Sequence, residues 1–237
     1  MGKSIETSFG ARLRSLENAA QILRLWPDYN PASADIKLPA LKAFITSVIA
    51  ANNLETTSKA QYTTSVGERR KFYSEKGSSM TFLLSSIRGA VEELYGRGSA
   101  EAKAAISIIA KMRATKLVTL PKDPANPDAA QTVSQSQQSF GSKAQYFADL
   151  VTTLGTFNNY TSARTETSLP ALQQMVDDVR TANNMVAQNI GSLKLSRTTR
   201  NELYEKMEVL GQKIKDNAKN TWTVKSSQYK TLVALGI

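Results

Sequence analysis

Two stretches of the chain decide its fold: LPALKAFITSVIAANN at residues 38–53 and LPALQQMVDDVRTANN at residues 169–184. They lie 131 residues apart and share eight identical residues. Each places a proline in the first turn of an expected helix, where its missing N–H costs nothing. Apolar residues then recur at spacings of four and three, which is typical of a helix facing a bundle seam. The stripes are Leu41, Ile45, Val48 and Asn52 in the first stretch, and Leu172, Val176, Val179 and Asn183 in the second.

The same offset continues outside these stretches. Tyr29 returns as Tyr160, and further identities pair Ala32 with Ala163, Arg69 with Arg200 and Tyr73 with Tyr204. Leu16, Leu23 and Trp26 correspond to Phe147, Leu154 and Phe157. After Tyr73 the match decays, and Ser99–Lys103 then corresponds to Ser226–Lys230, which implies four residues fewer in the second copy. A constant offset over this length predicts an internal duplication.

The expected architecture is all-α, with two tandem copies of an antiparallel four-helix unit. In the first copy, turn residues and stripes predict helices over about 8–26, from about 38, over about 69–95 and over about 100–113. The predicted organisation is a first helical repeat at 1–114, a Pro/Ser/Gln-rich linker at 115–139 and a second repeat at 140–237. Short turns favour antiparallel helical hairpins. Whether the repeats form one bundle or two stays open at this point.

Composition removes most catalytic chemistry. The 237 residues include no cysteine and no histidine. The chain therefore lacks thiolate nucleophiles, thiolate zinc sites, the usual general base at neutral pH and the commonest metal ligand. Phosphate-binding glycine loops are also missing. We expect no catalytic, cofactor-binding or metal-binding residues, no cofactor and no small-molecule substrate.

Charge and hydropathy indicate the cellular location expected for the chain. The formal net charge is +10, and the basic excess is spread along both halves rather than collected in a tail. The N-terminal residues lack the apolar segment of a secretory signal. The most apolar stretch, 38–54, carries Lys42, Asn52 and Asn53, so no membrane span is expected. A cytoplasmic location is the default expectation.

Asn52 and Asn183 continue apolar stripes, so both side chains should be partly buried. A buried amide without a partner costs about 1–3 kcal/mol. The favoured interpretation is a pair of structural hydrogen bonds that fix helix register. Contact with a ligand is the alternative.

Basic residues gather beside aromatic ones in both repeats. Arg69, Arg70 and Lys71 precede Phe72 and Tyr73, and the corresponding zone of the second repeat holds Arg197, Arg200 and Tyr204. Such clusters can grip phosphates and stack bases, so these five basic residues are candidate anion or partner contacts. The competing interpretation is the solvated start of a helix.

One motif resembles a catalytic spacing. Ser227 and Lys230 fit the Ser-x-x-Lys spacing of serine acyl-enzymes, but the further partner motifs of those enzymes are missing. Helix capping by Ser226 or Ser227 is the favoured interpretation.

Two motifs resemble a pattern found in uncharacterised bacterial helical-bundle proteins. One is R-x-x-x-Y-x-x-x-x-G, present as Arg69, Tyr73 and Ser78, with Gly77 beside the departing serine. The other is G-x-x-S-x-x-Y-K, similar to residues 224–230, where the first repeat has Ala102 in place of the tyrosine. The resemblance covers about a quarter of the chain. It implies a duplicated bundle and no known activity.

These features together favour a non-enzymatic structural or interaction protein that associates with itself into a homo-oligomer or filament. The alternative is a helical protein that binds nucleic acid or an anionic surface through its basic charge. The favoured partner is a further copy of the chain, and nucleic acid is the alternative partner.

Overall fold

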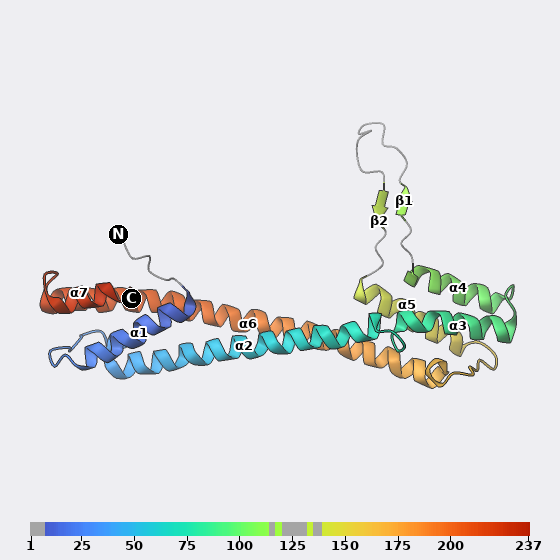
Figure 1. The fold of residues 1–237 in the computed structure, drawn as a ribbon, viewed down its shortest axis with the longest axis horizontal. Helices are drawn as coiled ribbons and strands as arrows, with labels where there is room; N and C mark the ends of the chain where they lie inside the picture. The colour runs from blue at the N-terminus through green and yellow to red at the C-terminus, as the bar shows by residue number, and fades with distance from the viewer. Residues whose placement is uncertain (1–7, 114–116, 120–131, 135–138) are drawn as a thin grey trace, which may run out of the picture. The chain divides into compact units, whose positions relative to one another are not determined.

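A computed structural model describes residues 8–113, 117–119, 132–134 and 139–237 (Figure 1). The fold is all-helical, which confirms the fold class expected from the sequence. The α-helices are α1 (Phe9–Arg24), α2 (Leu38–Ser74), α3 (Met80–Tyr95), α4 (Ala100–Arg113), α5 (Phe140–Gly155), α6 (Leu169–Trp222) and α7 (Ser227–Ala234). Short 3-10 turns, η1 (Ala34–Ile36) and η2 (Thr165–Thr167), precede α2 and α6.

Two three-residue strands are also present. β1 (Leu117–Thr119) pairs antiparallel with β2 (Thr132–Ser134), with Val118 opposite Val133. Both lie within the predicted linker at 115–139, and the rest of that linker lies outside the described residues.

Helices α1 and α5 begin in the same way. The Ser8 side chain accepts a hydrogen bond from the Ala11 N–H, and the Ser139 side chain accepts one from the Ser142 N–H. Each bond satisfies one of the free N–H groups at a helix start. Both helices bury one apolar stripe: Leu16, Ala19 and Leu23 in α1, and Phe147, Leu150, Val151 and Leu154 in α5.

The helix predicted over about 69–95 is wrong at its start. Residues 69–74 instead form the last turns of α2, and α3 begins only at Met80. Gly77, with a φ of 98°, lies in the turn between the two helices. This conformation is one that glycine adopts without strain. The Ser79 side chain then caps α3 by accepting from the Phe82 N–H.

The second repeat differs from the first in helix number. Its described residues contain α5, α6 and α7, because α6 runs unbroken over 54 residues. Between Tyr73 and Met80 the offset to similar residues falls from 131 to 127, which places the turn around Gly77 at this change. The second predicted repeat has no such turn, and α6 is continuous there. Met80, Leu83 and Ile87 of α3 correspond in this register to Met207, Leu210 and Ile214 of α6, and all six are buried.

The chain divides into two compact units. Unit 1 contains Met1–Gln61 and Ile190–Ile237, and unit 2 contains Tyr62–Asn189. Each unit therefore combines the first half of one predicted repeat with the second half of the other. Each has its own apolar core, and in unit 2 helix α4 packs against both α3 and α5 (Figure 1). None of the described helices is both long enough and apolar enough to cross a membrane.

Candidate functional site

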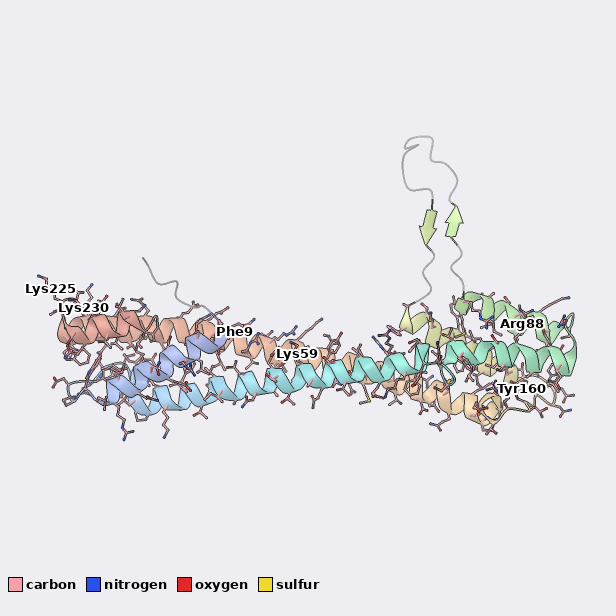
Figure 2. All side chains as sticks on the ribbon, viewed as in Figure 1. Phe9, Lys59, Arg88, Tyr160, Lys225 and Lys230 are labelled. Atoms are coloured by element: carbon pink, nitrogen blue, oxygen red, sulfur yellow. The ribbon has the colours of Figure 1, made fainter. Side chains whose placement is uncertain are left out.

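A tyrosine at the centre of unit 1 joins residues from three helices. The amide Nδ2 of Asn52 donates to Tyr204 Oη at 2.9 Å, and that hydroxyl donates to the backbone carbonyl of Phe9 at 2.9 Å. The Tyr204 side chain is 1% exposed, so its hydroxyl depends on these two partners. Phe9 lies at the start of α1 (Figure 2). Its ring packs on the Tyr204 ring, with 4.5 Å between the ring centroids.

Unit 2 contains the same cluster. Asn183 Nδ2 donates to Tyr73 Oη at 2.8 Å, and Tyr73 Oη donates to the carbonyl of Phe140 at 2.7 Å. The Tyr73 and Phe140 ring centroids lie 4.6 Å apart. Burial raises the pKa of Tyr73, and the hydrogen bond from Asn183 acts in the opposite direction. We call these two sets of residues the tyrosine clusters.

An arginine covers the phenylalanine in each tyrosine cluster. Arg200 Cζ lies 4.3 Å from the Phe9 ring centroid, and Arg69 Cζ lies 4.0 Å from that of Phe140. A guanidinium in this position gains cation–π attraction. The Nε atoms of both arginines are buried without a hydrogen-bond partner. Each Nε lacks a partner because the guanidinium lies against a phenylalanine ring, which offers no hydrogen-bond acceptor atom.

The two clusters differ in their acidic partners. In unit 1 the Glu55 carboxylate lies 3.1 Å from Arg197 and 3.3 Å from Arg200. At the 131-residue offset, Val186 stands where unit 1 has Glu55 and Val66 stands where it has Arg197, so unit 2 has apolar side chains at these two positions. Within the described part of the chain, Arg69 has no ion-pair partner.

A second tyrosine occupies equivalent places in the loops before α2 and α6. Tyr29 Oη donates to the Ile36 carbonyl at 2.6 Å, and Tyr160 Oη donates to the Thr167 carbonyl at 3.0 Å. Burial raises the pKa of both hydroxyls to about 12, with a smaller contribution from Asp35 at Tyr29 and from Tyr95 at Tyr160. These bonds hold each 3-10 turn against its loop.

Edge-on aromatic pairs are repeated as well. Trp26 meets Trp222 in unit 1 with 5.0 Å between ring centroids, and Phe157 meets Tyr95 in unit 2 with 5.6 Å, both at 72°. Each pair joins the end of α1 or α5 to the end of α6 or α3. In both, one ring belongs to each predicted repeat.

The five basic candidate residues are divided between the two units. Arg69, Arg70 and Lys71 belong to unit 2, while Arg197 and Arg200 belong to unit 1 and pair with Glu55. Lys71 pairs with Glu68 at 2.8 Å, which raises the pKa of Lys71. Arg70 and Lys71 line a shallow depression of about 280 Å³ together with Gly67, Ser74 and Glu75. Arg69 points to the other side of α2, toward Phe140.

The Ser-x-x-Lys spacing lies at the start of α7. Ser226 caps this helix by accepting from the Tyr229 N–H at 3.1 Å, and the Ser227 hydroxyl bonds the neighbouring Gln228 side chain. Among the described residues, no group of three or more acidic side chains is placed to hold a metal ion. Asn52 and Asn183 are both partly buried and hydrogen-bonded to tyrosine, as described above.

Sequence reasoning missed Phe9, Phe140 and Glu55. A signal for the two phenylalanines was present, because Ser8-Phe9-Gly10 returns as Ser139-Phe140-Gly141 at the same offset of 131. No comparable signal marks Glu55, whose counterpart is a valine. Comparison with known proteins found no matching family model, no similar curated protein and no similar solved structure.

Proposed function

We propose that this protein is a non-enzymatic structural or interaction protein that associates with further copies of itself. The tyrosine clusters support this hypothesis because their chemistry is directed inward. Each tyrosine hydroxyl both accepts and donates one hydrogen bond, and each arginine lies on an aromatic ring. These hydroxyls and guanidinium groups stabilise the packing of the helices, and their hydrogen-bonding capacity is not directed toward a substrate.

The observation that carries the proposal is a set of exposed apolar side chains that recurs at the 131-residue offset. Phe9 and Phe140, which are counterparts at the 131-residue offset, are 40% and 39% exposed. Leu54 and Met185, also counterparts, are 55% and 51% exposed. Exposed apolar groups that recur in two equivalent settings suit contacts between copies. Such quasi-equivalent surfaces can bind head to tail and so build rings or filaments.

We further infer that the chain consists of two copies of one ancestral segment, at 1–114 and 140–237, separated by the linker at 115–139. The recurrence of helix caps, tyrosine hydrogen bonds and aromatic pairs at constant offsets supports the duplication. These contacts involve residue types, such as the tyrosine hydroxyl and asparagine amide, that generic helix packing does not require. Their recurrence is therefore more specific than the recurrence of apolar stripes.

Light scattering coupled to size exclusion, with negative-stain imaging of the same fractions, tests self-association. We expect the mean mass to rise with protein concentration. Leu54→Glu and Met185→Glu should each lower the assembled fraction at a given concentration. Leu25→Glu is the matched control, because Leu25 is 77% exposed and its counterpart is Thr156. A monodisperse monomer at every concentration and salt level would contradict the proposal.

Binding of nucleic acid or an anionic surface is a second candidate, favoured by the net charge of +10 and by Arg69, which forms no ion pair with any residue that the structure describes. It predicts retention on heparin that falls steeply with added salt. Arg69→Gln should weaken retention more than Arg197→Gln, because Arg197 is already paired with Glu55. Equal elution of both variants and the parent chain would count against it.

A further inference from the structure

Unit 1 is assembled from two segments that are far apart in the chain. Residues 1–61 and 190–237 form it, and the continuous segment 62–189 between them forms unit 2. The contacts that close unit 1 therefore run between its two segments. They include the bond from Asn52 to Tyr204, the ion pair of Arg12 with Glu208 at 2.8 Å and that of Asp35 with Lys213 at 2.6 Å.

These contacts do not depend on both segments belonging to one chain. The segment 1–61 supplies α1, η1 and the first part of α2, while 190–237 supplies the last part of α6 and α7. Each segment contributes an apolar face to one shared core: Leu16 and Val48 lie in the first segment, and Met207 and Leu210 lie in the second. A segment with such a face binds the same complementary segment of a second chain equally well.

The helices are weakly packed where the chain passes from one unit to the other. Along α2, only Ser58 and Ser65 are buried between residues 53 and 72. Along α6, only Leu193 and Ser196 are buried between residues 187 and 203. Burial of a serine contributes little hydrophobic free energy compared with burial of a leucine or valine.

Ser65 and Ser196 bond within their own helices, whereas Glu55 of α2 pairs with Arg197 and Arg200 of α6. Ser65 Oγ donates to the Tyr62 carbonyl at 2.8 Å, and Ser196 Oγ donates to the Leu193 carbonyl at 3.0 Å. Gly67 and Gly191 lie in the interiors of these helices, and a Cβ at either would meet no atom within 4 Å. Interior glycine costs a helix about 1 kcal/mol relative to alanine, so neither is explained by close packing. Redirecting α2 or α6 here would leave these serine hydroxyls bonded.

We propose that unit 1 is completed between chains: residues 1–61 of one copy pair with residues 190–237 of a second copy. This inference rests on the proposed self-association and names its interface. Each chain offers one segment of each kind, so reciprocal exchange gives a closed dimer and sequential exchange gives a head-to-tail filament. In dilute solution the intramolecular arrangement dominates, because tethering gives it an effective concentration on the order of millimolar.

Thiol-specific cross-linking tests this proposal. The chain has no cysteine, so an introduced thiol is the only one that can react. One variant carries Asp35→Cys and another carries Lys213→Cys, at partly exposed residues that pair in unit 1. The two full-length variants, one of them isotope-labelled, are mixed, incubated at high concentration and treated with a short bis-maleimide. We expect a covalent product that contains one copy of each variant. The control pair replaces Lys213→Cys with Lys194→Cys, which lies about 28 Å away along α6.

A second variant separates this interface from self-association in general. The double variant Asp35→Cys/Lys213→Cys, cross-linked within the monomer in dilute solution, should then fail to assemble when concentrated. If the parent chain assembles but the cross-linked monomer assembles equally well, exchange is overturned and self-association stands. Equal yields from the test and control pairs would also overturn exchange. If the parent chain never assembles, both proposals fail.

Discussion

Asn52 lies in the first predicted repeat and Tyr204 in the second, yet the amide of Asn52 donates to the hydroxyl of Tyr204 at 2.9 Å. Asn183 and Tyr73 repeat this bond at 2.8 Å with the repeats exchanged. The aromatic pairs Trp26–Trp222 and Phe157–Tyr95 join the repeats in the same way. Each compact unit is thus held by contacts between repeats.

A double-mutant cycle tests the first of these bonds. Asn52→Ala and Tyr204→Phe should each lower the free energy of unfolding by about 1–2 kcal/mol, because each leaves a buried polar group without its partner. We expect a coupling energy of about 1 kcal/mol between them. Denaturant unfolding monitored by circular dichroism measures all four proteins. The control cycle combines Asn52→Ala with Tyr73→Phe, which lies in the other unit, and its effects should add. Additive effects in the first cycle would contradict the bond.

Cleavage between the repeats should leave the protein assembled. A protease site introduced within residues 120–131, which lie outside the described residues, would separate the chain into its two predicted repeats. Because each apolar core contains residues of both repeats, we expect the two fragments to elute together in native size exclusion and to separate in denaturant. Fragments that separate under native conditions, each remaining helical, would show that the repeats fold independently.

Alkaline pH should weaken the fold through Tyr29 and Tyr160. An unfolded tyrosine ionises near pH 10, whereas burial raises the pKa of both residues to about 12 in the folded chain. Between these values the folded state keeps a proton that the unfolded state loses, so stability falls as pH rises. The contribution is fully present below about pH 10 and is lost by about pH 12.

Denaturant unfolding between about pH 9 and about pH 12 measures this decline. Tyr29→Phe should make the fall of the unfolding free energy with pH less steep. At neutral pH the same variant should lower the unfolding free energy by about 1 kcal/mol, because the Ile36 carbonyl loses its hydrogen-bond donor. Ile36→Val, which alters the same loop but keeps the Tyr29 hydroxyl and the backbone carbonyl that accepts from it, serves as the control and should leave the steepness of the decline unchanged. If the unfolding free energy of Tyr29→Phe falls with pH as steeply as that of the parent chain, ionisation of Tyr29 does not cause the decline.

Thr223 offers a route to a more stable chain. It follows α6 with a φ of 69°, and its counterpart after α3 is Gly96, with a φ of 88°. A β-branched residue in this conformation is strained. We expect Thr223→Gly to raise the free energy of unfolding by about 1 kcal/mol. Thr223→Val keeps the branching and should give no gain in thermal melts. Equal melting temperatures for the glycine and valine variants would argue against strain at this position.

The sequence by itself determined the helical class and the starts of α1, α2 and α4, and it predicted the repeat. Apolar stripes with helical spacing predict α1, α2, α5 and α6, since a helix must bury one face whatever its partner is. The serine caps and the proline of each Leu-Pro-Ala-Leu segment act within a few residues, so they too are local properties. The asparagines stood out because an amide in an apolar stripe needs a hydrogen-bond partner.

Only the tertiary structure decided which helix meets which. A stripe such as Leu41, Ile45 and Val48 shows that a face is buried, but the stripes of the two repeats are alike, so either could cover it. The structure places Tyr204 beside Asn52 and Tyr73 beside Asn183, which exchanges the halves of the repeats between units. The continuity of α6 contributes to this outcome, because its 54 residues include parts of both units and have no turn at which the helix could fold back on itself. Hydrophobic burial is non-directional, and partner choice therefore depends on the path of the whole chain.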